Sequence, residues 1–390
     1  MKKLIMLCVL SAITTLLPVE DARAAAYEIT PGVEAREEYN DNLILDGVDT
    51  EGDYISSVIP SLKVSLSTER TEAVLSGKFD AYWYADHDEY NAVDRQASLD
   101  FSHALSRVLT TGFTAEYKKD SKIDRDLELT GMTTGTAVRE KEKYSTRLDW
   151  NTSEISTINL TLAYDEEDYD DPEYVDFVSR SVSTGWAHGI SNLINSTVGQ
   201  VACTYTEYDY RNSTISNSLL SLGLAHQLNE LWDLGFSLGP NYIRTHYGTD
   251  NEELEEKWGT YIYGTLNRKG FYNKFSSVLS RSEEAVSGRD GTVDRITFKL
   301  LYEHRPAKKI RYGGVFRYYR NRSDTGFHSR DVNEHHYHVT PRISYEIRDN
   351  VFVEASYLYT FIKDKDESLD KERNQVAIRL YWSMPVIGRF

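Results

Sequence analysis

The feature that most constrains this chain is a period of two in its hydrophobicity, which runs from Tyr27 to the C-terminus. Segments of about ten residues alternate apolar with polar side chains, and polar connections separate them. One segment places Trp232, Leu234 and Phe236 on one face and Asp233 and Ser237 on the other. Because successive side chains of a strand point to opposite sides, each segment predicts a strand with one apolar and one polar face.

The connections between these segments alternate in length. Short turns are expected near Glu69, Ser106, Glu154, Asn192, Asn229, Lys269, Ala307 and Asp349. Longer polar loops are expected at about 40–53, 87–94, 118–143, 166–177, 207–213, 246–257, 283–292, 322–334 and 363–372. This arrangement predicts eighteen strands with both termini on the short-turn side, which is the periplasmic side of an outer-membrane barrel. Sixteen strands are the alternative, because 194–206 and 257–268 alternate poorly.

Aromatic composition and hydrogen bonding together indicate a membrane barrel. The chain contains 28 Tyr, 13 Phe and 6 Trp, rings that membrane barrels place at both bilayer boundaries. Strands cross hydrocarbon only when the sheet closes and leaves no edge unpaired. We therefore predict an all-β fold, a transmembrane antiparallel up-and-down β-barrel in the outer membrane of a Gram-negative-type bacterium. A tyrosine-rich secreted sandwich or solenoid is the alternative.

The N-terminus has the layout of a secretory signal peptide. Lys2 and Lys3 precede an apolar run over 4–17, and small residues follow up to Ala24 and Ala26. We expect a cleaved signal over residues 1–26 and a barrel over 27–390. Beyond that signal, no stretch approaches the roughly 18 consecutive apolar residues of a membrane-spanning helix, and Cys203 has no second cysteine for an internal disulfide.

Net charge limits the partners of the chain. The formal charge is −17, which argues against nucleic acid as a partner. The acidic segments 166–171 and 252–256 could bind divalent cations that bridge lipopolysaccharide, although they lack the ligand spacing of a calcium loop. Outer-membrane lipid and lipopolysaccharide are the expected surroundings, and no cofactor or metal is expected.

Charged residues on the polar faces predict an uneven lumen. A basic wall is expected from Arg36, Arg295, Lys299, Arg311, Arg317, Arg342 and Arg379, with closure placing the first beside the last. Earlier strands offer an acidic side made of Asp80, Asp100, Glu116, Asp149 and Asp165. Such a transverse field could select a charged solute. Equally, these charges could simply pair across neighbouring strands.

Three further features leave a choice of interpretation. The longest loop, 118–143, is expected to be an ordinary extracellular loop, and an inward-folded constriction is the alternative. His336 and His338 share a lumen face but lack a third metal ligand. Histidine also recurs where strands meet short turns, which indicates an interfacial girdle more than a metal site; the positions are His103, His188, His226 and His304.

The C-terminal segment carries an assembly signature. Val376, Trp382 and the final Phe390 share one parity, and a terminal aromatic after an alternating strand resembles the signal that barrel-assembly machinery recognises. Pro385 has the opposite parity and no N–H to donate, so a kink or an end of the strand is expected there.

The stretch Glu37-Glu38-Tyr39-Asn40-Asp41-Asn42-Leu43 resembles the start of the outer-membrane β-barrel porin family associated with exopolysaccharide gene clusters. The likeness extends as architecture over the whole barrel, and its Asn and Asp residues are also local turn formers. The resemblance implies a wide barrel that helps a secreted polysaccharide across the outer membrane, beside a periplasmic polysaccharide export protein. It carries over no catalytic or binding residue.

Three functions compete. Exopolysaccharide secretion is favoured, with Tyr82, Tyr84, Tyr319 and Tyr381 as lumen-facing contacts for a sliding polymer. A passive or selective diffusion porin for small solutes is the alternative, and it requires a constriction. A barrel enzyme is the third, but no nucleophile elbow or zinc motif is present in the sequence, so the chain is expected not to be an enzyme.

Overall fold

The computed structural model describes residues 26–122, 125–130, 137–192, 194–248, 253–285, 288–289, 291–323, 332–365 and 370–389. Residues 1–25 of the expected signal peptide and Phe390 of the expected assembly signal lie outside these ranges, so both remain predictions. Trp382 is described, and it is 40% exposed on the outer face.

Nearly all of the described chain is β-strand. The strands are β1 (Ala26–Asn40), β2 (Asp53–Ser67), β3 (Thr71–Tyr84), β4 (Ala92–Ala104), β5 (Leu109–Asp120), β6 (Arg139–Ser153), β7 (Ser156–Tyr169), β8 (Phe177–Gly189), β9 (Thr197–Tyr210), β10 (Ser213–Gln227), β11 (Trp232–Tyr247), β12 (Glu253–Lys269), β13 (Asn273–Ala285), β14 (Thr292–Ala307), β15 (Ile310–Ser323), β16 (Asn333–Arg348), β17 (Val351–Asp364), β18 (Asp370–Ser383) and β19 (Val386–Arg389). Two short helices interrupt them, η2 (Asp88–Tyr90) and α2 (Leu127–Thr130). No helix in the described ranges is long and apolar enough to cross a membrane.

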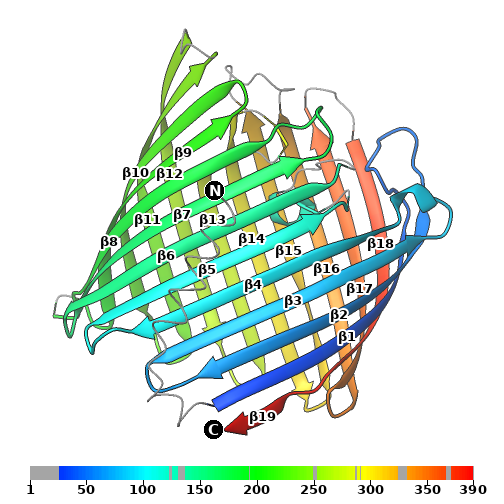
Figure 1. The fold of residues 1–390 in the computed structure, drawn as a ribbon, viewed down its shortest axis with the longest axis horizontal. Helices are drawn as coiled ribbons and strands as arrows, with labels where there is room; N and C mark the ends of the chain where they lie inside the picture. Colours follow the sequence, from blue (N-terminus) through cyan, green and yellow to red (C-terminus); the bar gives the residue numbers. More distant parts are fainter. Residues whose placement is uncertain are drawn as a thin grey trace.

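The sheet closes on itself. Each strand pairs antiparallel with the next, and β1 pairs with β2 on one side and with β18 and β19 on the other. Figure 1 shows the tilted strands of the closed barrel, with blue β1 beside the red C-terminal strands. β18 and β19 occupy a single barrel position that breaks at Met384 and Pro385, as expected from the missing proline N–H.

Eighteen barrel positions result, which confirms the preferred count. The alternative of sixteen is wrong because both doubtful segments are paired strands, β9 and β12. Their weak alternation does not prevent ladder hydrogen bonds, which any residue except proline can donate. All eight short turns lie where predicted, and the two-residue turn after β16 uses Asn350 at φ 66°, a left-handed conformation that asparagine tolerates.

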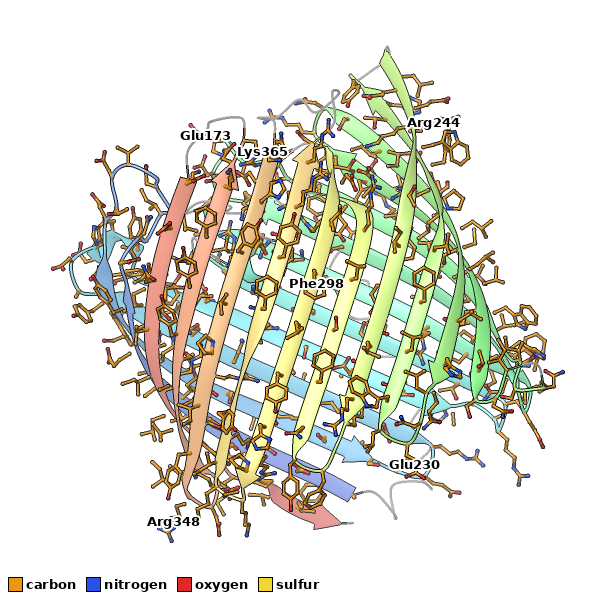
Figure 2. All side chains as sticks on the ribbon, turned by 180° about the vertical axis from the view of Figure 1, so that it is seen from behind. Glu173, Glu230, Arg244, Phe298, Arg348 and Lys365 are labelled. Carbon is orange, nitrogen blue, oxygen red and sulfur yellow. The ribbon has the colours of Figure 1, made fainter. Side chains whose placement is uncertain are left out.

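Alternation separates an outer and an inner face. Leu222 and Leu238, opposite each other on β10 and β11, are 60% and 50% exposed on the outside. Inward side chains such as Ser57 and Asn241 are polar and buried. Apolar and aromatic side chains, Phe298 among them, cover the outer surface in Figure 2. An apolar exterior without open edges suits hydrocarbon, which confirms the predicted outer-membrane location.

Several predicted loops are shorter than expected because polar strand ends stay paired. The loop at 207–213 reduces to Arg211 and Asn212, and the loops at 166–177, 246–257 and 283–292 also lose residues to strands. Ion pairs accompany these extensions, as between Arg180 and Glu207 at 3.4 Å. Polarity marks where a strand leaves the membrane, whereas the ladder ends only where backbone pairing stops.

The histidines near the short turns share one contact. Each faces outward near the periplasmic end, and its Nδ1 contacts the first residue of the preceding strand. The pairs are His103 with Thr71 (2.8 Å), His188 with Ser156 (2.5 Å), His226 with Thr197 (2.8 Å) and His304 with Asn273. Neighbouring strands are thereby linked at the membrane boundary. Within the described ranges, no group of three or more His, Cys, Asp or Glu is arranged to hold a metal ion.

The Tyr-Asn-Asp-Asn motif fastens the seam of the barrel. Asn42 is 1% exposed, and its Nδ2 donates to the carbonyls of Asp46 (2.7 Å) and Glu372 (2.8 Å). Asp41 accepts from the backbone N–H and the side-chain amide of Asn374 at 2.7 and 2.8 Å. The first loop is therefore held against β18, next to β1, where the barrel closes.

Candidate functional site

The connection between β5 and β6 folds into the barrel. Its described residues, 121–122, 125–130 and 137–138, are called the inward segment below, and they include α2. Leu127 is fully buried against Leu45 and Ile362, and the Asn321 amide donates to the Thr130 carbonyl at 2.9 Å. Ile362 and Asn321 are lumen-facing residues of β17 and β15, far from β5 in strand order. The described part of this connection therefore folds inward against the opposite wall, so the expectation of an ordinary extracellular loop is wrong and the inward-folded alternative is favoured.

A buried ionic cluster anchors the inward segment to the wall. The Arg139 guanidinium, 2% exposed, contacts Asp120 at 3.0 Å, Asp126 at 2.8 Å and Glu167 at 3.5 Å. Arg125 donates to the carbonyls of Ala137 (2.5 Å) and Asp120 (3.3 Å). A buried cation with several carboxylates fixes a geometry, because removing one partner leaves charges without solvation. The segment is thus held at both of its ends.

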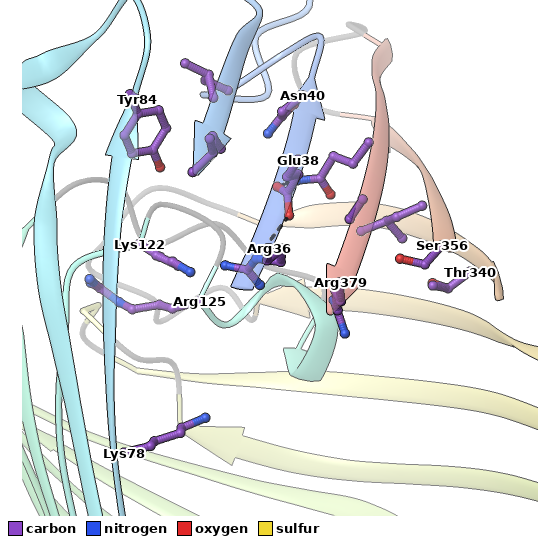
Figure 3. Close-up of a pocket in the computed structure, with 15 residues that line it drawn as sticks. Arg36, Glu38, Asn40, Lys78, Tyr84, Lys122, Arg125, Thr340, Ser356 and Arg379 are labelled. Atoms are coloured by element: carbon purple, nitrogen blue, oxygen red, sulfur yellow. Dashed lines mark hydrogen bonds and ion pairs between the residues drawn. The ribbon is translucent and has the colours of Figure 1, made fainter. Parts of the chain in front are cut away.

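Beside this segment lies a cavity of about 440 Å³, called the basic cavity below. Among the described residues, one carboxylate, Glu38, and five cations line it; the cations are Arg36, Lys78, Lys122, Arg125 and Arg379. Figure 3 shows them converging from β1, β3, β18 and the inward segment. Clustered cations in a confined space raise the local positive potential, although the whole chain is acidic.

The cations of the basic cavity are only partly neutralised. Lys122 Nζ lies 2.8 Å from Asp80 Oδ2, while Arg36 is 3.8 Å from the same oxygen. Arg379 reaches Glu354 at 3.6 Å and Glu34 at 3.9 Å. Among the described residues, Lys78 makes no ion pair. Over the same residues, the Nη2 of Arg125 has no hydrogen-bond partner.

The residues expected to form the basic wall all face the lumen, but they do not form one surface. Arg36 and Arg379 are register partners and line the basic cavity. Arg295 is tied to Glu284 and to Asn321, and Arg342 lies 3.8 Å from Glu303. The others occupy separate places on the wall: Arg311 stacks over Phe352, whereas Lys299 and Arg317 are opposite each other on β14 and β15.

The residues expected on the acidic side also face the lumen, and most have partners. Asp80 pairs with Lys122 at 2.8 Å, Asp149 pairs with Arg147 at 2.6 Å, and Asp165 pairs with Lys143 at 3.3 Å. Asp100, Glu116 and Asp165 line a second cavity of about 590 Å³ over β4–β9, called the acidic cavity below. Pairing across strands therefore explains part of the pattern that the sequence shows.

A loop beside the basic cavity is held by one carboxylate. Asp53 accepts from the backbone N–H groups of Asp86 and His87 and from the His87 ring Nδ1, at 3.1, 3.0 and 3.0 Å. The hydrogen bond to Asp53, with Glu51 3.3 Å from Nε2, raises the pKa of His87 above its usual value. The imidazole thus ties residues 85–91 to the start of β2, next to Tyr84, which lines the cavity.

Sequence reasoning missed three of the five cavity cations. Lys78 is on the polar face of its strand, so its parity could have identified it. Lys122 and Arg125 belong to a loop without periodicity, where only the length of the connection gave a signal. His336 and His338 are buried in the lumen wall, bonded to Glu334 (3.0 Å) and Thr360 (3.1 Å).

Comparison with known proteins finds structural likeness only. No family model matches the chain, and no curated protein matches it. Among solved structures, the chain is similar to OpdO of Pseudomonas aeruginosa (10% identity, TM-score 0.49, 92% of this chain and 97% of that one). It is also similar to a BenF-like porin of Pseudomonas fluorescens Pf-5 (11%, 0.49, 92% and 99%) and to OccAB3 of Acinetobacter baumannii (9%, 0.47, 93% and 99%). At such identities the likeness concerns architecture alone.

Proposed function

We propose that this chain is a diffusion channel of the outer membrane for small anionic solutes. The observation that carries the proposal is the inward segment, which lies inside the barrel beside a cavity lined, among the described residues, by five cations and one carboxylate. A barrel of eighteen positions is too wide for its own side chains to fill. Selection among solutes therefore requires an internal constriction, and a charged constriction favours ions of the opposite sign.

The same observation weighs against polysaccharide secretion. A polymer must thread through a continuous wide passage, whereas the inward segment crosses part of the lumen and is anchored by Arg139. Three tyrosines expected to contact a sliding polymer are buried: Tyr82, Tyr84 and Tyr319 are 1%, 9% and 3% exposed. They support the inner wall and offer little surface to a sugar chain.

Bilayer recordings in a potassium chloride gradient test the proposal. The wild-type channel should prefer chloride, and Lys78→Glu with Arg379→Glu should move the reversal potential toward the potassium value. Arg342→Glu is the matched control, because Arg342 faces the lumen outside the basic cavity and lies beside Glu303. Unchanged selectivity in the double variant would overturn the proposal. An equal shift in the control would mean that total lumen charge, and not the basic cavity, selects ions.

Cells provide a second test. Deletion of the chain should reduce uptake of small anions and leave polysaccharide secretion intact. If deletion instead traps polymer in the periplasm while small-solute permeability is unchanged, the secretion hypothesis replaces the diffusion channel.

A further inference from the structure

The outer face carries a group of basic side chains, four cations and one histidine, at the extracellular ends of β15, β16 and β17. Arg320, His335 and Lys363 are direct register neighbours across these three strands. Arg322 and Lys365 flank them at the same end, where Figure 2 labels Lys365. These five residues are called the outer cation row. Their parity is that of the exposed apolar residues, so they face the membrane surroundings and not the lumen.

An aromatic row lies directly below, toward the membrane centre. Tyr318, Tyr337 and Phe361 are register neighbours, with ring centroids 5.1 and 6.0 Å apart. Aromatic side chains of membrane barrels collect at the boundary between hydrocarbon and headgroups. Residues one step further out on the same face therefore lie at the height of the lipid headgroups. The outer cation row occupies that height.

Pairing distinguishes this row from four other outward cations of the same rim. Those cations have carboxylate partners on neighbouring strands: Lys119 with Glu140 (2.7 Å), Arg180 with Asp209, Arg244 with Glu256 (3.1 Å) and Arg281 with Asp294 (2.9 Å). Over the described residues, Arg320, Arg322, Lys363 and Lys365 form no ion pair. Asp370 is opposite Lys363 in register, yet the two form no ion pair.

Two donors in the row are buried without a hydrogen-bond partner in the described part of the protein, Arg320 Nε and His335 Nε2. The other ring nitrogen of His335 contacts the Tyr318 hydroxyl at 2.9 Å. When that hydroxyl donates to Nδ1, the hydrogen of the neutral ring is on Nε2, which is then a donor without a partner among the described residues. Buried donors without partners are costly unless a ligand satisfies them.

We propose that the outer cation row binds the phosphate groups of a phosphorylated glycolipid of the outer leaflet, of the lipid A type. Phosphate oxygens accept several hydrogen bonds, and a guanidinium with adjacent ammonium groups matches them in charge and geometry. The aromatic row beneath would contact the first part of the acyl chains. This site is on the outside of the barrel, so it is independent of the proposed channel function.

Binding of purified lipid A to the detergent-solubilised full barrel tests the proposal. The wild type should bind bisphosphorylated lipid A more tightly than the same lipid after enzymatic dephosphorylation. Arg320→Ala with Lys363→Ala should weaken binding of the bisphosphorylated form, by roughly fivefold for each cation removed. The matched control is Arg180→Ala with Arg244→Ala, which removes two outward cations that already have carboxylate partners.

Heat-modifiable mobility on gels establishes whether each variant is folded. If the double variant is not folded, Lys363→Gln alone, at an exposed position, replaces it in the binding experiment. Three results would overturn the proposal: wild-type affinity in the double variant, equal loss in the control, or equal binding of the dephosphorylated lipid. A competition experiment with inorganic phosphate is the remaining test. If it displaces lipid A at concentrations comparable with the lipid, the row is a site for a soluble anion, and the lipid assignment is wrong.

Discussion

The basic cavity and the acidic cavity differ in what surrounds their charges. The acidic cavity over β4–β9 is built by strands alone, and its carboxylates share the wall with hydroxyls and Lys143. The basic cavity combines the seam strands β1 and β18 with β3 and the inward segment, which adds Lys122 and Arg125. Strand alternation can place charges around a wide lumen, but a segment that leaves the wall is needed to concentrate them.

Loss of the Arg139 anchor should have the largest effect on this difference. Arg139→Ala removes the buried cation shared by Asp120, Asp126 and Glu167. Asp120 keeps Lys118 and Arg125, and Glu167 keeps Lys141, so we expect a loss of about 3 kcal/mol in unfolding free energy. We also expect higher single-channel conductance, because the inward segment is released. Urea unfolding and bilayer recordings measure the two effects.

Arg180→Ala is the control for that prediction, since it removes an arginine whose ion pairs are solvent-exposed. We expect a change of less than about 1 kcal/mol and normal conductance. Wild-type conductance in Arg139→Ala would show that the segment does not restrict the passage.

The seam should have the next largest effect. Asn42→Ala removes three partly buried hydrogen bonds, two that fold the first loop onto Asp46 and one that holds it beside β18, with an expected cost of about 1–3 kcal/mol. Because Leu45 of that loop packs on Leu127, open-channel noise should also increase. Val48→Ala, in an exposed part of the same loop, is the control. If Asn42→Ala has the stability and the open-channel noise of the wild type, the seam does not stabilise the inward segment.

Charge reversal in the acidic cavity tests whether the acidic and basic cavities contribute unequally to ion selectivity. Glu116→Lys should increase anion preference, but by less than Lys78→Glu with Arg379→Glu decreases it, because the acidic cavity is wider and lacks the inward segment. Reversal potentials in the same salt gradient measure both. Equal and opposite shifts would indicate that the lumen acts as one averaged field.

The smallest effect should be a dependence on pH at the loop beside the basic cavity. Asp53 raises the pKa of His87 in the folded chain, so this contact stabilises the loop fully below the ordinary histidine pKa of about 6.5. The stabilisation is lost as pH rises through the raised value. The rate of amide hydrogen exchange in residues 85–91 should therefore rise above that pH. The rise should exceed the one in His87→Gln, which shows only the intrinsic base catalysis of exchange. Matching profiles in the two proteins would contradict this.

The fold could be predicted because its signals are local and repeated. Alternation identified the strands, the turns and the inward parity of Arg36 and Arg379, and the break at Pro385 follows from one missing donor. Strand ends were predicted less well. Polar residues such as Glu166 and Glu167 continue the β7 ladder beyond the membrane, and no property of a single segment reveals the partner strand that keeps them paired.

The sequence by itself determined a closed barrel with an apolar exterior and a charged interior, because a period of two in a membrane has no other way to satisfy the backbone. Only the tertiary structure decided that the inward segment (121–122, 125–130 and 137–138) turns into the barrel. Its contacts join positions as distant as Thr130 and Asn321, 191 residues apart, and a loop without periodicity carries no local record of such contacts. The constriction, and with it the basic cavity, exists only once the barrel has brought both walls within reach.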